Sequence, residues 1–531
     1  MHRRILLLSA VAGILSSPST VLKTSGALAA EGASATGDDA VPFSFDMLSE
    51  AMEARAAEPY QAPNADLPKI IADLTYDQHR AIRYRPERAV WKGEAPFELQ
   101  AFHMGWLFKE PVNLHVVEGG AARPLVFSGD DFEYRPPLEA DRFKDISMPG
   151  VAGFRLHHPL NDPEIMDELV TFLGASYFRA LGRGNLYGLS ARGIAVDTAT
   201  ATGEEFPRFT DFYIERPGER DKDVTLYAAL DGPSVTGAYA FRITPGEDTQ
   251  MEVTTRLYMR SKVERLGIAP MTSMFFFGEN NNRAFDDYRT EVHDSDGLKI
   301  VRTDGEEIWR SLNNPSVLAN SFFEEENPEA FGLFQRDRNF EDYQDGGAAY
   351  HRRPSLLVEP LGEWGKGFVH LIEIPTDLEI NDNIVAYWVP EGEITRGQRL
   401  EFSYRLTWGA ISERSDTTAR VLGVRTGIGG VSVLEEDKVD KAVRKFVVDF
   451  RGDILRKFSG EPGISASIGV GGGKIEHSTI SSVQDDTWRL AVDVRPDGGD
   501  PVEISAFLTS GDRRLSETWM YQWRRGDGSP S

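Results

Sequence analysis

The sequence of 531 residues contains no cysteine. This absence excludes disulfide frameworks, thiolate nucleophiles and cysteine-based metal sites. The chain also lacks a long apolar run beyond its N-terminal region, so no segment there is expected to cross a bilayer. We therefore expect a globular protein without stable membrane insertion.

Positive charge is scarce as well. The chain has 58 lysine and arginine residues against 83 acidic residues, which gives a formal charge of -25. A surface of this sign repels polyanions, so nucleic acid and anionic lipid are excluded as main partners. A neutral ligand fits the composition better.

Several motifs of catalysis and cofactor binding are missing. The ten histidines show no HExxH or HxH spacing, so no metal site and no cofactor are expected. No GxSxG nucleophile elbow is present, and the glycine-rich runs do not match phosphate-binding loops. Asp294, Asp296 and Gly297 match part of a calcium loop, but Gly305 stands where the loop requires glutamate.

The N-terminal segment 1–30 has the pattern of an export signal. Arg3 and Arg4 precede the apolar stretch ILLLSAVAGIL, and small residues around Ala29 offer a cleavage site. The paired arginines are typical of the twin-arginine route, although an ordinary secretory signal remains an alternative. Residues 31–42 are predicted to form a flexible spacer.

Beyond this spacer, strand patterns dominate. In LEFSYRLTW (400–408), apolar residues alternate with polar ones, as in a half-buried strand. Similar alternation recurs at 237–244, 256–263 and 488–496, between turn clusters rich in glycine, proline and aspartate. Helices are predicted at 43–60 and 163–181, with a mixed segment at 438–450. This pattern predicts a mainly β protein of packed antiparallel sheets.

A polar, glycine-rich break after Trp408 divides the chain. We predict a large β-sandwich domain over 43–409, a linker over 410–420, and a smaller β-sandwich of immunoglobulin size over 421–525.

The triplet Asn381, Asp382 and Asn383 stands immediately before the strand-like run IVAYWVP. Asparagine and aspartate disfavour strand interiors because their side chains compete for backbone hydrogen bonds. The triplet is therefore either a polar turn or a turn whose side chains serve a site. Tyr387 and Trp388 favour a sugar site, since aromatic faces and polar groups together bind pyranose rings.

A second acidic cluster lies in YRTEVHDSDGLKI. Glu291, His293, Asp294 and Asp296 crowd into six residues. The sequence DSDG is also a good turn, so a structural interpretation and a functional one both remain open.

Four long segments carry a resemblance to a known family. FLGASYFRALGRGNLYGLSARGIAVDT, MTSMFFFGENNNRAFDDYRTEVHDSDGL, FGLFQRDRNFEDYQD and EINDNIVAYWVPEG resemble the periplasmic glucan biosynthesis proteins G and D, over about Phe43 to Trp523. The resemblance implies a large N-terminal β-sandwich similar to galactose mutarotases and a smaller immunoglobulin-like C-terminal β-sandwich. It also implies a periplasmic protein whose ligand is a β-1,2-linked glucan. The paired arginines favour the D type.

For function, the resemblance implies two alternatives. The first is an inverting endo-β-1,2-glucanase in which Asp382 is the general acid and Asp294 the general base. A relay through water or a sugar hydroxyl would link the base to the reaction if the two carboxylates lie too far apart for direct attack. The second is a non-catalytic factor that binds glucan and organises its synthesis and decoration. Mutarotase activity would rest on fold analogy alone.

Other residues are expected near the substrate. The expected substrate contacts are Tyr350, Arg352, Arg353, Glu359, Trp364, Glu379 and Trp388. Tyr350 could pass a proton or orient a hydroxyl, or could equally be a core tyrosine. A homodimer and a contact with the glucan synthesis machinery are both left open as partners.

Overall fold

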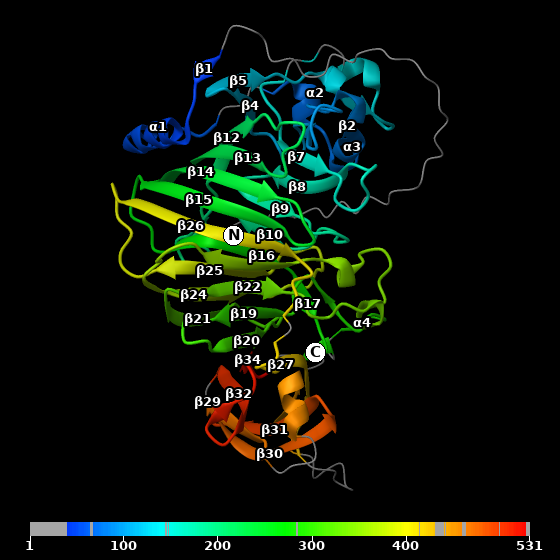
Figure 1. Cartoon of the computed structure of the whole chain (residues 1–531), viewed down its shortest axis with the longest axis vertical. Coiled ribbons are helices and arrows are strands. Elements are labelled where there is room, and N and C mark those ends of the chain that lie inside the picture. Colours follow the sequence, from blue (N-terminus) through cyan, green and yellow to red (C-terminus); the bar gives the residue numbers. More distant parts are fainter. Residues whose placement is uncertain are drawn as a thin grey trace.

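The computed structural model describes residues 40–526, except 64–66, 144–145, 147, 283–284, 414, 431–439, 441, 459–462 and 499. The predicted export signal, most of the spacer and part of the mixed segment 438–450 lie outside the described residues. Within them the protein is mainly β and elongated, with a small C-terminal part at one end (Figure 1). No helix among the described residues is both long and apolar enough to cross a membrane.

The largest sheet has sixteen strands. In spatial order it contains β1 (Val41–Pro42), β5 (Ala121–Leu125), β4 (Asn113–Glu118), β12 (Arg208–Glu215), β13 (Val224–Asp231), β14 (Val235–Thr244), β15 (Thr249–Met259), β26 (Arg399–Gly409), β23 (Ser355–Pro360), β22 (Ala330–Phe334), β19 (Gly297–Val301), β20 (Glu307–Ser311), β34 (Thr518–Trp523), β32 (Val502–Ser510) and β29 (Ser465–Gly471), with β33 (Arg513–Arg514) beside β32.

A ten-stranded sheet faces the larger one. Its order is β21 (Ala319–Glu326), β24 (Lys366–Glu373), β25 (Ile384–Pro390), β16 (Leu266–Ser273), β10 (Ser190–Arg192), β9 (Tyr177–Ala180), β8 (Asp167–Leu173), β7 (Gly153–His158) and β3 (Glu98–Phe102), with β11 (Ala195–Val196) beside β16. Buried residues of both sheets, such as Phe172 and Phe212, form one core, so the large part is a β-sandwich.

The small C-terminal part is built around a second core. A four-stranded sheet runs in the order β27 (Arg420–Ile428), β28 (Arg444–Arg451), β31 (Thr487–Pro496) and β30 (Gly473–Gln484). Its buried residues, including Val448 and Leu490, share a core with Ile504 and Trp519 of the larger sheet. The parallel pairing of β20 with β34 makes this larger sheet continuous from one part to the other. The small part therefore has two layers: the four-stranded sheet, and strands of the sheet that also builds the large part.

Short elements complete the fold. Two-stranded sheets join β17 (Phe275–Phe277) to β18 (Val292–His293) and β2 (Ile82–Tyr84) to β6 (Phe132–Tyr134). The helices are α1 (Phe45–Ala57), α2 (Lys69–Ala72), α3 (Tyr76–Arg80) and α4 (Phe340–Tyr343), with 3₁₀ turns at Pro86–Arg88, Gly129–Asp131, Ala140–Phe143, Tyr350–Arg352 and Asp453–Phe458.

The leading helix is confirmed. Helix α1 begins after Ser44, whose hydroxyl accepts the Met47 N–H at 3.2 Å, and it packs Leu48 and Met52 against the outer face of the large sheet. The strands predicted at 237–244, 400–408 and 488–496 are confirmed as β14, β26 and β31, whereas the strand predicted at 256–263 continues only to Met259, where β15 ends.

The helix predicted at 163–181 is wrong. This segment forms β8 and β9, which pair antiparallel across a tight turn. Gly174 and Ala175 make that turn with φ angles of 81° and 42°, a left-handed conformation that interrupts any helix. Strand pairing on both sides outweighs the apparent helical spacing of the apolar residues.

Candidate active site

The turn before β25 holds Asp382 between two asparagines that serve the backbone. The Asn383 amide donates to the carbonyl oxygens of Phe275 (2.9 Å) and Ile374 (3.1 Å), and its oxygen accepts the Phe275 N–H at 2.8 Å. The Asn381 side chain bonds within the same turn. These bonds explain why residues that avoid strands precede a strand here: the two asparagine amides fix the turn that carries Asp382.

Asp382 lies close to a cation on a neighbouring strand. Its Oδ2 is 3.8 Å from Nη2 of Arg179 on β9, and the Asp382 side chain is 13% exposed. Strands β25 and β9 belong to the same sheet, connected through β16 and β10. The Asp382 carboxylate therefore faces a guanidinium while part of it still reaches solvent.

Asp294 follows β18 and is buried. Its backbone N–H donates to the Met274 carbonyl at 2.8 Å, and its carboxylate forms an ion pair with Arg353. Burial raises the pKa of Asp294. Arg353 opposes this shift, the negative charge of Asp382 adds to it, and Arg179 opposes it, with an upward net direction. The two acids therefore share one electrostatic neighbourhood.

Chain topology explains this proximity. Strand β16 ends at Ser273, which pairs with Ile384, the first residue of β25. Asp382 thus lies immediately before the strand that meets the end of β16. Met274, which follows that end directly, accepts the backbone N–H of Asp294. The segments that carry the two acids therefore meet at the same end of β16.

A network of polar side chains adjoins the buried ion pair. The Arg353 guanidinium carbon lies 4.0 Å from the ring centroid of Tyr350, whose hydroxyl donates to Glu379. Glu379 also accepts two hydrogen bonds from Arg289, at 2.8 and 3.1 Å. Burial raises the pKa of Glu379, but the bonds from Arg289 and Tyr350 outweigh this effect, so the pKa lies below its usual value.

Arg352 and Glu359 occupy different surroundings. Arg352 is exposed, and its guanidinium donates twice to the Gly184 carbonyl, at 3.1 and 3.0 Å. Glu359 lies on β23 of the larger sheet, opposite Arg405, with buried Val358 on the core-facing side next to it. Arg352 thus belongs to the same 3₁₀ turn as Tyr350. Glu359, in contrast, lies on the outer face of the larger sheet.

The predicted aromatic contacts are core residues in this structure. Trp364 and Trp388 are 7% and 0% exposed, and their rings pack with centroids 6.1 Å apart. Tyr387 is fully buried, with its hydroxyl 3.0 Å from Nδ1 of His370. None of these three rings offers a face to a sugar in this conformation.

Two arginines near the acids were not singled out by the sequence. Arg179 lies in the segment that was predicted as a helix. A strand prediction would have placed its side chain on the opposite face of the sheet from the buried Phe178 and Ala180. Arg289 binds Asp345 at 2.9 Å in addition to Glu379. In the sequence, Arg289 stands close to the acidic cluster that begins at Glu291, and this position could have singled it out.

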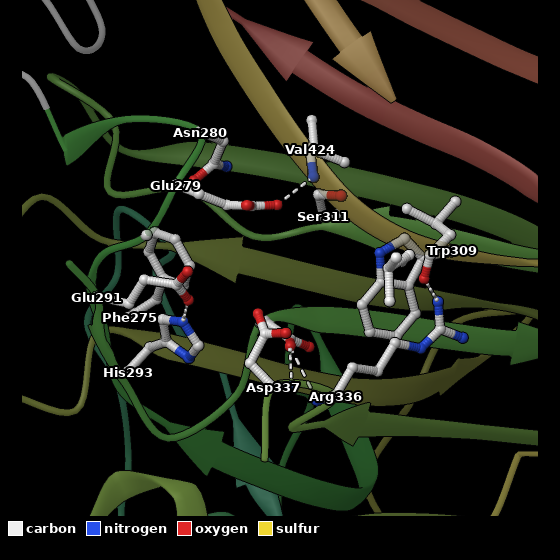
Figure 2. Close-up of a pocket in the computed structure, with 15 residues that line it drawn as sticks. Phe275, Glu279, Asn280, Glu291, His293, Trp309, Ser311, Arg336, Asp337 and Val424 are labelled. Carbon is white, nitrogen blue, oxygen red and sulfur yellow. Dashed lines mark hydrogen bonds and ion pairs between the residues drawn. The ribbon is translucent and has the colours of Figure 1, made fainter. Parts of the chain in front are cut away.

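A pocket with a different lining lies between the large part and β27 (Figure 2). Its lining residues are Phe275, Gly278, Glu279, Asn280, Glu291, His293, Asp296, Trp309, Ser311, Arg336, Asp337 and 421–424. Neither Asp294 nor Asp382 is among them, so this pocket is separate from the acid pair.

Comparison with known proteins identifies the family. The model of the family described as "Periplasmic glucan biosynthesis protein, MdoG" matches residues 43–523. The chain is 52% identical over 487 residues to "Glucans biosynthesis protein G" of Cereibacter sphaeroides, covering 91% of this chain and 89% of that protein. Proteins of the same name from Ralstonia nicotianae and Bradyrhizobium diazoefficiens are 44% and 41% identical, over 92% and 95% of this chain and 97% and 98% of theirs.

These relatives carry the G-type name, and the preference for the D type stays a prediction. The family match extends over nearly all described residues, and its range includes the positions of both acids. The chain therefore belongs to the MdoG family of periplasmic glucan biosynthesis proteins.

Proposed function

We propose that this protein is an exported, periplasmic inverting endo-β-1,2-glucanase that acts in glucan biosynthesis. The family and the names of its relatives support the biosynthetic setting. One observation carries the hydrolytic part: the segments that carry Asp382 and Asp294 meet at the same end of β16, and the charge of Asp382 acts on the pKa of Asp294. Two interacting carboxyl groups are what glycoside hydrolysis by inversion requires.

The exposure of the two acids suggests their roles. The Asp382 side chain is 13% exposed and that of Asp294 is 3% exposed. The general acid must touch the glycosidic oxygen, which favours the more accessible Asp382. Asp294 would then be the general base, and its burial requires a group between it and the attacking water.

Tyr350 is a candidate for this intermediate position. Its ring lies against Arg353, the ion-pair partner of Asp294, and its hydroxyl is oriented by Glu379. A hydroxyl that takes a proton from a water or a sugar hydroxyl must give up its own proton, so the relay to Asp294 requires the Tyr350 hydroxyl proton to turn from Glu379 toward Asp294. Arg289 holds Glu379 in place for this purpose.

The test uses linear β-1,2-glucan. The wild-type protein should release reducing ends, and Asp382→Asn and Asp294→Asn should each lower that rate by at least about a thousandfold, because each removes a proton donor or acceptor of the transition state. The newly formed reducing end should appear first in the inverted anomeric form by nuclear magnetic resonance. A wild-type rate equal to that of both variants would contradict the proposal.

The ion pair of Asp294 favours a second candidate. In this conformation Arg353 occupies the carboxylate, as expected if the pair is structural and the protein binds glucan without cutting it. Such a factor would guide glucan synthesis or decoration, with the small C-terminal part contacting the synthesis machinery. It predicts glucan binding without turnover in the wild type, and unchanged binding in Asp382→Asn.

A further inference from the structure

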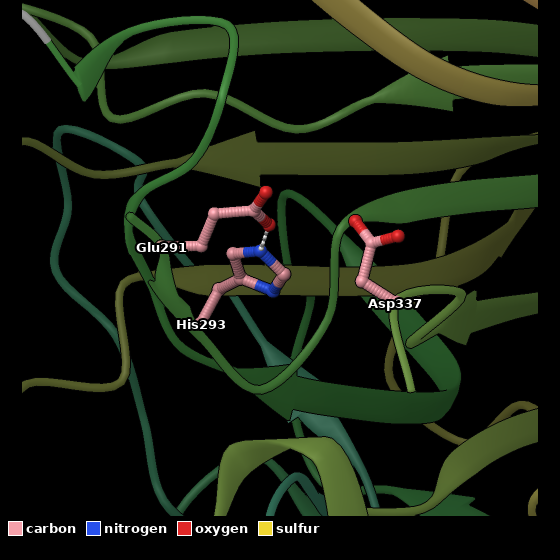
Figure 3. Close-up of side chains that lie close together, drawn as sticks. All are labelled: Glu291, His293 and Asp337. Atoms are coloured by element: carbon pink, nitrogen blue, oxygen red, sulfur yellow. Dashed lines mark hydrogen bonds and ion pairs between the residues drawn. The ribbon is translucent and has the colours of Figure 1, made fainter. Parts of the chain in front are cut away.

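The pocket beside β27 contains three potential metal ligands on its large-part wall. Glu291, His293 and Asp337 each present one donor atom, and all three atoms lie within 4.8 Å of one another (Figure 3). Glu291 and His293 are buried, and Asp337 is half-buried. Donors bound at about 2.1 Å to a tetrahedral ion lie about 3.4 Å apart, so side-chain rotations that shorten the longest separation would close the set.

Hydrogen bonds define the tautomer of His293. Nδ1 lies 2.8 Å from Oε1 of Gln335, while the Gln335 amide nitrogen donates to the backbone oxygens of His293 (2.8 Å) and Tyr350 (3.3 Å). The amide orientation is thereby fixed, and Oε1 must accept a hydrogen bond from Nδ1–H. In the neutral ring the lone pair is then on Nε2, which is the form that binds metals.

This lone pair points at another acceptor. Nε2 of His293 is 2.8 Å from Oε2 of Glu291. A neutral imidazole nitrogen and a carboxylate oxygen would repel each other at this distance. A positive charge must therefore be shared there, carried either by a proton or by a metal ion.

Two carboxylates near His293 have oxygens without hydrogen-bond partners among the described residues. Oδ1 of Asp296, which lines the same pocket, is buried without a hydrogen-bond partner. No hydrogen bond or ion pair to the Asp337 carboxylate is found among the described residues.

Arg336, which lines the pocket, already binds other acids. Arg336 binds Glu413 at 2.7 Å and Glu517 at 2.6 Å, and its guanidinium carbon is 3.4 Å from the Trp309 ring centroid (Figure 2). It points toward the small part rather than toward Asp337. Arg425 pairs with Glu279 at 2.6 Å, so these two arginines are engaged with acids other than Asp337.

We propose that Glu291, His293 and Asp337 bind one divalent transition-metal ion, with Nε2 as the nitrogen ligand. One imidazole and two carboxylates suit ions such as Zn²⁺ and Mn²⁺, whereas Ca²⁺ and Mg²⁺ prefer sites made of oxygen alone. The Gln335 bond to Nδ1 is the outer contact that such histidine ligands normally make. Sequence spacing did not reveal the site because Asp337 comes from a later segment.

The site would have a structural effect on the neighbouring acids. His293 directly precedes Asp294, and Gln335 bonds both the His293 and Tyr350 backbones. A bound ion would fix the end of β18 and so hold the segment that carries Asp294. This role does not depend on the proposed hydrolysis.

The test is metal binding by the full chain after dialysis against a chelator. Calorimetric titration with ZnCl₂, and separately with MnCl₂, should show one ion bound per chain, and Asp337→Asn should weaken binding by at least about tenfold. His115→Gln is the matched control, because His115 is another histidine near a carboxylate, 3.7 Å from Asp211, and should leave binding unchanged. Circular dichroism confirms that each variant is folded.

A second measurement needs no variant. Crystals of the wild type soaked in ZnCl₂ should show anomalous scattering between Glu291 and His293. Absence of stoichiometric binding, equal binding by Asp337→Asn, or scattering only elsewhere would overturn the proposal, and would assign the contact to a protonated His293 paired with Glu291.

Discussion

Arg353 and Asp294 form an ion pair in which the side chains are only 4% and 3% exposed. Removing one partner of a buried pair leaves the other charged and unpaired, which typically costs about 3–5 kcal/mol. We expect Arg353→Leu to lower the free energy of unfolding by about this amount. Chemical denaturation should show that adding Asp294→Asn recovers much of the loss, whereas simple additivity of the two changes would contradict direct coupling.

Arg179 lies 3.8 Å from Asp382, and it also lowers the pKa of the neighbouring Asp294. Arg179→Met should leave the two acids to repel each other and should reduce glucan turnover by at least about tenfold, since charge placement is often the largest catalytic effect. Reducing-end assays check this result. Arg183→Met is the control, because Arg183 lies close in sequence but its side chain is 57% exposed.

The two asparagines around Asp382 should differ in importance. Asn383 is 2% exposed and bonds three backbone groups, so Asn383→Ala should destabilise the protein by about 2 kcal/mol or more. Asn381 makes one side-chain bond in a more accessible position, and Asn381→Ala should cost less than about 1 kcal/mol. Equal losses in urea denaturation would show that the turn is not held as described.

Stability should fall in acid through His370. Burial lowers its pKa to about 3, and nearby Arg265 adds to this shift. In the unfolded chain this histidine takes up a proton near pH 6.5, whereas in the folded protein it does not. The contribution of neutral His370 to the free energy of unfolding is therefore fully present above pH 6.5 and is lost as the pH falls toward 3. The loss should approach on the order of 4 kcal/mol. Denaturation curves of His370→Gln should depend less steeply on pH in this range.

Tyr288 is the most promising exposed aromatic residue near the polar network. It is 75% exposed and adjoins Arg289, which binds Glu379. If a glucan passes over this network, the ring offers a stacking surface, and Tyr288→Ala should weaken glucan binding several-fold. Affinity electrophoresis can measure this. Phe322→Ala, a similarly accessible aromatic on β21, should have no effect; an equal loss there would argue against a specific surface.

Local patterns predicted many of the elements. Alternation of apolar residues predicted β26 and β14 because neighbouring positions of a strand face opposite sides of a sheet, which is visible in a few consecutive residues. The same reasoning failed at β8 and β9, where apolar residues happen to repeat at helical spacing. There the left-handed turn at Gly174 and pairing with distant strands decided the outcome.

Composition and strand patterns by themselves determined that this is an acidic, mainly β protein, and the resemblance of its motifs to a known family selected Asp382 and Asp294 as the candidate acids. Only the tertiary structure decided that Trp388 is a core residue, that Arg353 closes on Asp294, and that Arg179 lies beside Asp382. The physical reason is that burial and ion pairing depend on which segments meet in space, and these residues come from strands and turns far apart in the chain.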